Sequence, residues 1–590
     1  MERGLSTFNS LVVGDRIFRI PIYQRHYSWS AKQWDDLWND LMYLKEGRKH
    51  YFGTILQKAT GARKSSGMKT FDVLEIIDGQ QRLTTALIFL KEIISQLYTI
   101  TETDQVEELE KLREDYLRYK DVHKLELLGD DAEFFRRNII NDEVYPDEIL
   151  TPSQRRLLEA KHYFKGKLEE LKKTMTPDEF RTLLLELKRR IDDMEIIRYD
   201  VKNDADAVLI FETVNDRGKP LTNLEKTKSF LMHAIYLSAP EELEGYLDQV
   251  NVSFTDIYRW IEEIKNTTRG RNLGEDDVQR YHFVIYETEA KGNRDISYDY
   301  LSFLKNRIRG LYRGNPLQCL NYVLNYTKDL RKAFYALKEI ITFNEENRTG
   351  QLIQKLFVLE RVANFYPFLI AAWIRFREEK EKMDEILSLI ETIAFRVYAI
   401  GRRRADTGES WLYTLAYRVH SENLEYSEIL EELKSLVRYY QNDKAFERDL
   451  KVENFYNRVS SRDKKYLFFE YEKFLRQKSR EPLDIKLDDI LSYDFEIEHI
   501  WADDSSQLGL SDDLKEIHEQ CKNKLGNLTI ASKSWNASWG NGPFSLKKNE
   551  YQKSNLRVQR DLAVIAEWGK EQIEERESKI IEFAMERWKI

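Results

Sequence analysis

Glycine and proline, the residues that most often make turns and end helices, are scarce in this chain. Only 24 glycines and 10 prolines occur among its 590 residues, so a turn-rich β architecture is disfavoured and long helices are favoured. The length exceeds what one hydrophobic core usually serves, which predicts two or three domains. With 42% hydrophobic and 33% charged residues, the chain has enough apolar material for these cores and a well-solvated surface.

Cysteine usage and the lack of long apolar runs exclude several classes of protein. The cysteines, Cys319 and Cys521, are far apart and lack the spacing of metal ligands, so neither a disulfide framework nor a zinc cluster is expected. Residues 1–11 contain no apolar stretch of signal-peptide length, and no apolar run approaches the length that spans a bilayer. The sequence therefore favours a soluble, cytoplasmic protein without a membrane partner.

Two short apolar strands are predicted near the C-terminus, each beside residues that can carry chemistry. The first, 495–501, contains Glu498 and His499, and the second directly follows Asn527. Asn536 lies further on, where a helix can begin. Carboxylate and carboxamide oxygens suit a hard cation such as Mg²⁺ or Mn²⁺. The pKa of histidine lies near neutrality, as a base that activates water requires.

The position of Glu498 next to His499 sets a condition on this site. Side chains of adjacent residues on an ideal strand point to opposite faces, so the pair can serve one site only if the strand twists or ends there. Glu-His at a strand end and Gly-Asn in a turn are each common, and either alone is more often structural than catalytic. In combination they predict a one-metal nuclease centre, in which the metal stabilises the charge that develops on the scissile phosphate.

The order of these residues, followed by Lys547–Lys548, resembles the HNH, or ββα-metal, nuclease domain at the C-terminus of modification-dependent restriction enzymes. The variant that it resembles ends in Asn instead of His. The resemblance implies that Glu498 and Asn536 hold the divalent cation and that His499 is the general base. It makes Asn527 the structural member of the catalytic set, which orients the loop.

The front of the chain predicts a second site, for a phosphate-bearing ligand. A strand at 73–77 runs directly into Asp78–Arg82, which reads Asp-Gly-Gln-Gln-Arg and opens a long helix. A strand, a glycine turn and a helix N-terminus favour phosphate, because free backbone N–H groups and the helix dipole meet there. Arg82 can add a bidentate phosphate contact, whereas Asp78 can approach a metal or a sugar hydroxyl. Without further support, Asp-Gly at a strand end is an ordinary turn.

Two other blocks of sequence supply that support. Gln24 and Arg25 lie in a polar and aromatic loop that follows a short apolar strand. Glu212 and Asn215 stand three positions apart on a predicted helix and share a face, and Arg217 follows in the loop that ends it. The three blocks together predict one ligand site.

These blocks, in this order, resemble the ParB-like nucleotide-binding domain marked by Asp-Gly-Gln-Gln-Arg, which occurs in GmrSD-type and phosphorothioate-sensing restriction proteins. The resemblance implies a site for a nucleoside triphosphate (NTP) and an NTPase activity, with the alternative that the nucleotide is only sensed. The residues that it assigns to the site are Gln24, Arg25, Asp78, Gly79, Gln80, Gln81, Arg82, Glu212, Asn215 and Arg217.

The expected fold is α+β and mostly helical. Residues 1–235 are expected to form the ParB-like α/β nucleotide-binding domain, 236–484 a helical scaffold, and 485–590 the ββα-metal HNH nuclease domain with a C-terminal helix. The apolar face of that last helix is expected to pack on the nuclease domain or on a second copy of the chain, which would make a homodimer.

The net charge of −9 argues only weakly against a nucleic-acid partner, because a large enzyme needs no more than a local positive channel. Three basic clusters could contribute to one: Lys188–Arg190, Arg402–Arg404 and Lys547–Lys548. The first is typical of a solvated helix face. The second lies in a polar loop that interrupts helical sequence, where it could grip the DNA backbone.

The sequence thus predicts a nucleotide-regulated, metal-dependent DNA endonuclease of the type IV kind, which restricts modified phage DNA. One alternative is an NTP-hydrolysing sensor of DNA modification with a degenerate nuclease domain. The other is a non-enzymatic component of a phage-defence complex. Metal-dependent nicking of a plasmid separates the first alternative from the prediction, and the second would show neither nucleotide turnover nor DNA cleavage.

Overall fold

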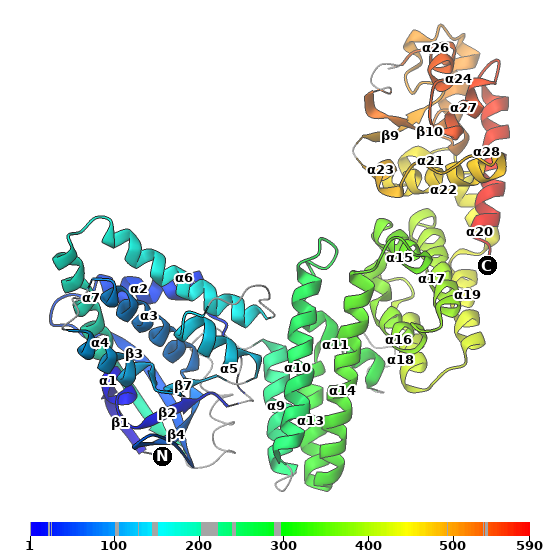
Figure 1. Cartoon of the computed structure of the whole chain (residues 1–590). Coiled ribbons are helices and arrows are strands. Elements are labelled where there is room, and N and C mark those ends of the chain that lie inside the picture. The colour runs from blue at the N-terminus through cyan, green and yellow to red at the C-terminus, as the bar shows by residue number, and fades with distance from the viewer. Residues whose placement is uncertain are drawn as a thin grey trace. The chain divides into compact units, whose positions relative to one another are not determined.

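The computed structural model describes residues 2–21, 24, 26–100, 105–127, 129–143, 151–201, 222–238, 243–287, 297–492, 494–534, 536 and 541–590. Four predicted site residues, Arg25, Glu212, Asn215 and Arg217, lie outside the described residues. The chain divides into two compact units (Figure 1). Residues 1–279 and 299–338 form the first unit, and residues 280–298 and 339–590 form the second.

A mixed six-stranded sheet lies at the centre of the N-terminal part of the first unit, with the strand order β1-β8-β3-β4-β2-β7. Its strands are β1 (Glu2–Thr7), β2 (Arg16–Arg19), β3 (Tyr51–Ser66), β4 (Lys69–Asp78), β7 (Leu125–Glu126) and β8 (Glu195–Asp200). A separate pair is β5 (Arg118–Tyr119) and β6 (Val122–His123). The strand predicted at 73–77 is confirmed as the end of β4, which pairs antiparallel with β3 and parallel with β2. The chain therefore leaves an inner strand of the sheet at Asp78.

Helices cover this sheet (Figure 1). They are α1 (Phe8–Val12), α2 (Ala31–Met42), α3 (Gln80–Tyr98), α4 (Val106–Tyr116), α5 (Asp130–Phe134), α6 (Pro152–Lys172) and α7 (Pro177–Asp192). Both α6 and α7 start with a Thr-Pro pair whose threonine caps the helix, since proline suits the first helical turn and the hydroxyl accepts a free backbone N–H.

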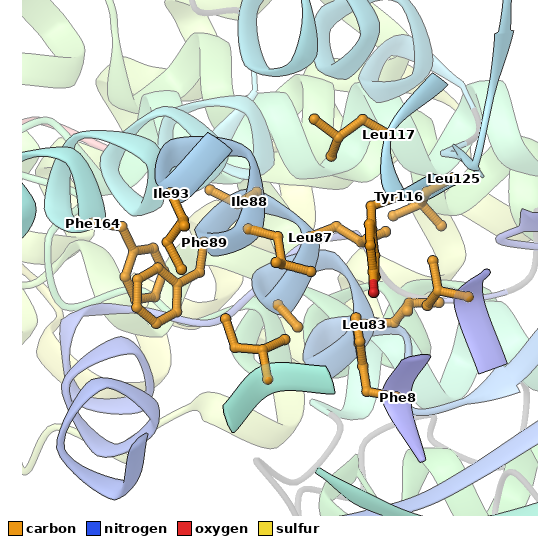
Figure 2. Close-up of a cluster of buried hydrophobic side chains, with 14 of the residues drawn as sticks. Phe8, Leu83, Leu87, Ile88, Phe89, Ile93, Tyr116, Leu117, Leu125 and Phe164 are labelled. Atoms are coloured by element: carbon orange, nitrogen blue, oxygen red, sulfur yellow. The ribbon is translucent and has the colours of Figure 1, made fainter. Parts of the chain in front are cut away.

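The long helix α3 is the centre of the core (Figure 2). It is apolar on nearly every side, as expected of a helix that is buried all round, and Leu83, Leu87 and Phe89 are almost fully buried. Phe89 stacks on Phe164 of α6 with ring centroids 4.5 Å apart, a contact that contributes about 1 kcal/mol beyond the area it buries. The Asp-Gly-Gln-Gln-Arg segment therefore joins an inner strand to a rigidly packed helix.

The rest of the first unit is helical. It consists of α9 (Asn223–Ser238), α10 (Leu243–Lys265), α13 (Tyr300–Gly314) and most of α14 (Pro316–Ile341), while α11 (Glu275–Tyr286) runs from the first unit into the second. Helices α9 and α10 pack against each other, and α10 also contacts α6. Residues of α9 and α10 can therefore reach the N-terminal part of the unit.

The second unit is almost entirely helical, which confirms the expected mostly helical α+β class. Its remaining helices are α15 (Arg348–Val358), α16 (Tyr366–Phe376), α17 (Lys380–Ile393), α18 (Glu409–Ser421), α19 (Tyr426–Gln441), α20 (Asp443–Leu450), α21 (Phe455–Arg458), α22 (Ser461–Ser479), α23 (Leu487–Leu491), α24 (Asp512–Cys521), α26 (Phe544–Tyr551), α27 (Arg557–Ala563) and α28 (Lys570–Arg587). The two predicted C-terminal strands are confirmed as β9 (Phe495–His499) and β10 (Leu528–Ser532), which form an antiparallel pair.

The C-terminal helix α28 packs on its own chain. It contacts the 3-10 turn Leu525–Asn527 and the helix α22, and the following Trp588 is fully buried. The Trp588 ring stacks on Phe395 with centroids 3.8 Å apart. The chain itself thus covers the apolar face of the helix, and a homodimer stays a prediction.

The cysteines and the length of the helices bear on two of the expectations from the sequence. Cys319 and Cys521 are free and buried, as the lack of a disulfide framework requires. Within the described ranges, every helix is too short or too polar to cross a membrane. The three-domain division at residues 235 and 484 stays a prediction.

One buried carboxyl of α28 leads to a stability prediction. Glu577 packs beside Gly526 of the 3-10 turn, and no described residue hydrogen-bonds to its buried Oε1. Burial raises its pKa from 4.5 to about 7. The unfolded chain therefore loses this proton at lower pH than the folded one, so stability falls as pH rises from about 4.5 to 7. Glu577→Gln is expected to raise the free energy of unfolding by about 2–3 kcal/mol at pH 8 and by little near pH 4.5.

Urea unfolding of both proteins at the two pH values measures this difference. The matched control is Glu574→Gln, on the exposed face of the same helix, which should change stability little at either pH. Equal gains for the two variants at pH 8 would contradict the assignment to Glu577.

Candidate functional sites

The pair Glu498 and His499 lies at the end of a strand. β9 stops at His499, which is opposite Leu528 of β10, and Glu498 is opposite Thr529. The next residue, Ile500, donates its backbone N–H to the Asn527 carbonyl at 2.8 Å. The strand therefore ends at the pair. Glu498 and His499 can serve one site only if the strand twists or ends there, so this requirement is met.

Glu498 is buried and paired with a lysine that lies 49 positions further along the chain. Lys547 of α26 donates from Nζ to Glu498 Oε1 and, at 2.7 Å, to the His499 carbonyl. Burial raises the pKa of the Glu498 carboxyl, and the Lys547 ammonium opposes this rise. Lys547 is only 1% exposed at its side chain, so the expectation that it belongs to a solvent-facing basic cluster is wrong. Its charge is needed inside the site, where a lone carboxylate would be poorly solvated.

His499 is buried among polar and aromatic groups. Its Nε2 lies 3.3 Å from Asn523 Oδ1, and its ring lies 4.3 Å, centroid to centroid, from the ring of Tyr456 in α21. Burial lowers the pKa of His499, although Asn523 acts in the opposite direction. The neutral imidazole, which can accept a proton, is therefore favoured at neutral pH.

Asn527 ties together the segments around the pair. Its side chain is fully buried, and Oδ1 accepts from the Trp501 backbone N–H at 2.8 Å and from Trp568 Nε1 at 3.0 Å. Nδ2 donates to the carbonyls of Trp501 and Lys522, both at 2.9 Å. Two of these bonds hold Trp501 in the loop that leaves β9, and the other two tie Lys522 and Trp568 to the same carboxamide, so Asn527 lies where a loop-orienting residue is needed.

Asn536 is brought to a carboxylate, but not to the predicted one. Its Nδ2 donates to Glu496 Oε2 at 2.9 Å, and Glu496 lies two positions before Glu498, on the same face of β9. Sequence reasoning missed Glu496, Asn523 and Tyr456, and it noted Lys547 without predicting its pairing with Glu498. Among the three missed residues, Glu496 had a signal, the alternation of two acidic residues along the strand.

The donor set suits a hard divalent cation by its chemistry. Glu496, Glu498 and Asn536 offer oxygen ligands of the kind that Mg²⁺ and Mn²⁺ prefer, whereas the Lys547 ammonium, bound to Glu498 Oε1, would compete with a cation for that oxygen. The described residues contain no cluster of three or more His, Cys, Asp or Glu that could hold a metal. A cation here would therefore rest on carboxylate, carboxamide and water oxygens.

At the front of the chain, the turn after β4 requires glycine. Gly79 has a φ of 93° and forms the N-cap of α3 without a side-chain hydrogen bond. A Cβ atom at Gly79 would lie 2.2 Å from Ile55 Cδ1, and left-handed φ values strain other residues. The backbone N–H groups that start α3 thus have no side-chain cap of their own, as an anion site requires.

Arg82 does not extend toward a ligand as expected. Its guanidinium donates to the carbonyls of Phe52 at 3.2 Å and Thr54 at 2.8 Å, and to Asp78 Oδ2 at 3.2 Å. Arg82 and Asp78 therefore bind each other and brace β3 against the start of α3. A bidentate phosphate contact from Arg82 stays a prediction, and it would require the guanidinium to leave these partners.

The glutamines of the motif instead face a polar pocket in the first unit. The pocket walls include Gln24, His26, Gln80, Gln81, Asp131 and Lys228. Gln24 Nε2 donates to the Ile77 carbonyl at 2.7 Å, while its buried Oε1 has no hydrogen-bond partner among the residues that the structure describes. The structure thus brings Gln24, Gln80 and Gln81 together and separates them from the Asp78–Arg82 pair.

Sequence reasoning missed His26, Asp131 and Lys228. Lys228 had a weak signal, since a lysine inside the buried run Thr227–Met232 is unusual for a residue type that normally stays exposed. Nothing in the sequence distinguished Asp131 from the other acidic residues around it.

Comparison with known families gives two matches, at the two ends of the chain. The profile of the GmrSD restriction endonuclease N-terminal domain matches residues 8–232, and that of the GmrSD restriction endonucleases, C-terminal domain, matches residues 440–583. The chain belongs to the GmrSD restriction endonucleases. Membership implies DNA as substrate and hydrolysis of its phosphodiester bonds, and a nuclease of this family suggests a divalent metal. A search of curated proteins returned no match.

The two family matches contain the two sites of this GmrSD protein. Residues 8–232 include the pocket wall from Gln24 to Lys228, and residues 440–583 include Tyr456, the β9–β10 pair and Lys547. The second match begins at α19 and so includes α20 to α22, whose sequence had no recognisable motif. Tyr456 of α21 shows that these helices contribute to the histidine's surroundings.

The basic clusters of the GmrSD chain differ in their partners. Lys188–Arg190 form ion pairs with Glu186, Asp192 and Asp193. Only Arg189 of the three is exposed, and Arg190 also donates to the Leu41 and Met42 carbonyls, so the expected solvated helix face holds for Arg189 alone. Arg402–Arg404 are exposed, and Arg404 pairs with Asp406 at 3.0 Å. Contact of this loop with DNA stays a prediction.

The packing around Arg82 gives a second stability prediction. Gly53 has a φ of 106°, and a Cβ there would lie 1.8 Å from Arg82 Nη1. Gly53→Ala is expected to lower the free energy of unfolding by about 2–3 kcal/mol, because it strains the backbone and displaces the guanidinium. Gly47→Ala is the control, since Gly47 has a φ of 76° but open space around it. Urea unfolding should show a clearly smaller loss for Gly47→Ala, and equal losses would contradict the role of Arg82.

Proposed function

We propose that this GmrSD protein is a nucleotide-regulated, metal-dependent endonuclease of the type IV kind, which cuts modified phage DNA. Restriction endonuclease activity on DNA follows from the family, and the finer statement is supported by two polar sites in one chain. The observation that carries the nuclease half is the convergence of Glu498, His499 and Asn527 where β9 ends. The proposal includes an HNH fold formed by β9, β10 and α26 and a ParB-like fold around the N-terminal sheet.

His499 acts as the general base in this proposal, through Nδ1. Because Nε2 lies beside the Asn523 amide oxygen, an acceptor, the ring proton belongs on Nε2 and Nδ1 is left to take a proton from water. The Tyr456 ring packs against the imidazole and restricts its rotation. Burial, which lowers the pKa of His499, keeps the base neutral at the pH of the cell.

Glu498 and Asn536 would hold the divalent cation, with Glu496 as a further carboxylate on the same face of β9. When bound, the cation supplies positive charge next to the scissile phosphate. Glu496 positions the Asn536 carboxamide by their 2.9 Å hydrogen bond. Lys547 opposes the rise in the pKa of Glu498 that burial causes and fixes its Oε1. Asn527 holds the loop after β9, so that the base and the carboxylates keep their relative positions.

The front site is proposed to bind a nucleoside triphosphate. Gln24, Gln80 and Gln81 line the pocket, and Gly79 leaves the N-terminus of α3 free for phosphate oxygens. Asp78 and Arg82 shape this turn by bracing β3. By resemblance, Arg25, Glu212, Asn215 and Arg217 complete the site.

A cleavage panel tests the proposed function. The full chain is incubated with unmodified, hydroxymethylated, glucosylated and phosphorothioated DNA, with and without each NTP, and with Mg²⁺, Mn²⁺ or EDTA. The expected result is metal-dependent cleavage of at least one modified DNA that changes when a nucleotide is added. Nucleotide turnover without cleavage of any DNA would favour the sensor with a degenerate nuclease, and inertness in both assays would favour the non-enzymatic component.

The lysine in the nuclease site allows a test that does not depend on activity. Lys547→Met leaves the buried Glu498 without its cation, and breaking such a pair should lower the free energy of unfolding by about 3–5 kcal/mol. If a divalent ion binds at Glu498, Mn²⁺ should restore more stability to this variant than to the parent protein. Thermal unfolding with and without Mn²⁺ measures both effects. Lys548→Met is the matched control, and the same response to Mn²⁺ in all three proteins would contradict a metal at Glu498.

A further inference from the structure

Lys228 places a buried positive charge in the wall of the front pocket. It is 2% exposed, and its Nζ donates to Asn251 Oδ1 of α10 at 2.9 Å. Burial lowers the pKa of Lys228 to about 8, although Asp131 and Glu225 act in the opposite direction. Within the described residues, no carboxylate lies within ion-pair distance of it. A buried cation without a counter-charge is unfavourable, and an anion in the pocket would compensate it.

His26 and Asp131 form a hydrogen-bonded pair in the same wall. His26 Nδ1 lies 2.8 Å from Asp131 Oδ2, and the hydroxyls of Ser153 and Thr151 also donate to this carboxylate. Burial alone would raise the pKa of Asp131, but His26 and the two hydroxyls hold it below its usual value. Asp131 is therefore an ionised acceptor, which places the imidazole proton on Nδ1 and leaves Nε2 to accept another.

The Asp-Gly-Gln-Gln-Arg motif holds the segment that carries this histidine. Gln81 Nε2 donates to the His26 carbonyl at 3.1 Å, and Gln81 Oε1 accepts from the Ser28 backbone N–H at 2.7 Å. The ring of Tyr258 packs on the His26 ring edge to face, with centroids 5.8 Å apart. Asp131 and Tyr258 thus fix the imidazole, and Gln81 fixes the backbone that carries it.

These groups line a pocket whose wall also holds a buried hydrogen-bond acceptor and a buried cation, so a polar ligand could bind there. Gln24 Oε1 is buried there without a hydrogen bond from any described residue, and Arg82, the cation that the sequence assigned to phosphate, is bound to β3 and Asp78. In the described part of the pocket wall, Lys228 is a buried cation. A fixed histidine backed by a carboxylate is the arrangement that general bases use to activate a hydroxyl or water.

We propose that His26, backed by Asp131, is the general base that hydrolyses a nucleoside triphosphate in this pocket, and that Lys228 binds its terminal phosphate. This inference rests on the proposed nucleotide site and adds its chemistry. A water oxygen forms a bond to the terminal phosphorus while the bridging P–O bond breaks. The water proton moves to His26 Nε2, and the products are a nucleoside diphosphate and inorganic phosphate. Lys228 Nζ donates to the oxygens of the transferred phosphoryl group, where negative charge has to be stabilised.

Two variants of the full chain test the inference. His26→Asn keeps a donor for Asp131 but lacks Nε2, so phosphate release from ATP, GTP, CTP and UTP should fall by about 100-fold or more. Its affinity for fluorescent, non-hydrolysable analogues of these nucleotides should stay within about threefold. Lys228→Met should weaken binding of the same analogues by about tenfold or more. The matched controls are His162→Asn on α6 and Lys226→Met, one half-turn before Lys228 on α9, and both should behave as the parent protein.

The outcomes separate the inference from the function on which it rests. If the parent protein binds the analogues but releases no phosphate, or if His26→Asn releases it at the parent rate, the inference is overturned and nucleotide binding stands. If the parent protein binds none of the analogues, the nucleotide half of the proposed function fails as well. Circular dichroism spectra and melting curves of each variant establish that it is folded.

Discussion

Replacing His499 with alanine is expected to lower the rate of DNA cleavage by about 10²–10⁴-fold, while DNA binding is retained. The imidazole is the group at the end of β9 that can take a proton from water at neutral pH, because burial lowers its pKa and Asn523 orients it. Alanine removes the base without removing the carboxylates of Glu496 and Glu498. Single-turnover cleavage of a modified plasmid at saturating protein measures the rate, and gel shift in EDTA measures binding.

The matched control for this loss is His420→Ala on α18, outside the β9–β10 region, which should cleave at the parent rate. Cleavage by His499→Ala at the parent rate would overturn the proposed mechanism. A parallel loss of DNA binding and of folded structure would instead assign His499 a structural role.

Replacing Asn527 with alanine is expected to lower the free energy of unfolding of the second unit by about 3–5 kcal/mol. The change leaves two buried donors, the Trp501 N–H and Trp568 Nε1, and two buried carbonyls, of Trp501 and Lys522, without the partner that the carboxamide provides. An unsatisfied buried polar group costs about 1–3 kcal/mol, and partial relaxation keeps the total below the sum. Urea unfolding followed by tryptophan fluorescence measures the loss.

Asn536→Ala is the control for the loss of stability expected in Asn527→Ala. Asn536 is half-buried and, among the described residues, makes one side-chain hydrogen bond, to Glu496, so its loss should lower stability by about 1 kcal/mol or less. Cleavage should nevertheless suffer in Asn536→Ala if this residue helps to hold the metal. Equal stability losses for the two asparagines would contradict the distinction between a loop-fixing amide and a ligand-site amide.

Local sequence patterns predicted the elements that frame both sites. The apolar runs of β4, β9 and β10, the glycine after Asp78 and the long apolar helix α3 each depend on neighbours within a few positions. Such patterns reflect backbone geometry and side-chain periodicity, which short segments specify by themselves. The loop role expected of Asn527 also agrees with its buried contacts, since a Gly-Asn turn before a strand places the amide inside the turn.

The ion pairs and the pocket walls could not be derived in this way. Glu498 binds Lys547 of α26, 49 positions further along the chain, and Asp131 binds His26, 105 positions before it. Arg82 binds two carbonyls of β3, which lie 28 and 30 positions before it. Each partner is selected because burial makes an unpaired charge unfavourable, and several lysines and acids of the chain could have satisfied that need.

Sequence alone determined the mostly helical class, the strands that frame the candidate sites, and membership of the GmrSD family, because residue types and short-range spacing suffice for these. Tertiary structure decided the direction in which each charged side chain points: Arg82 toward β3, Lys547 into the nuclease site, and Lys228 into the front pocket. The physical reason is that a charge is stabilised by whatever lies next to it after packing, and packing joins segments that are remote along the chain.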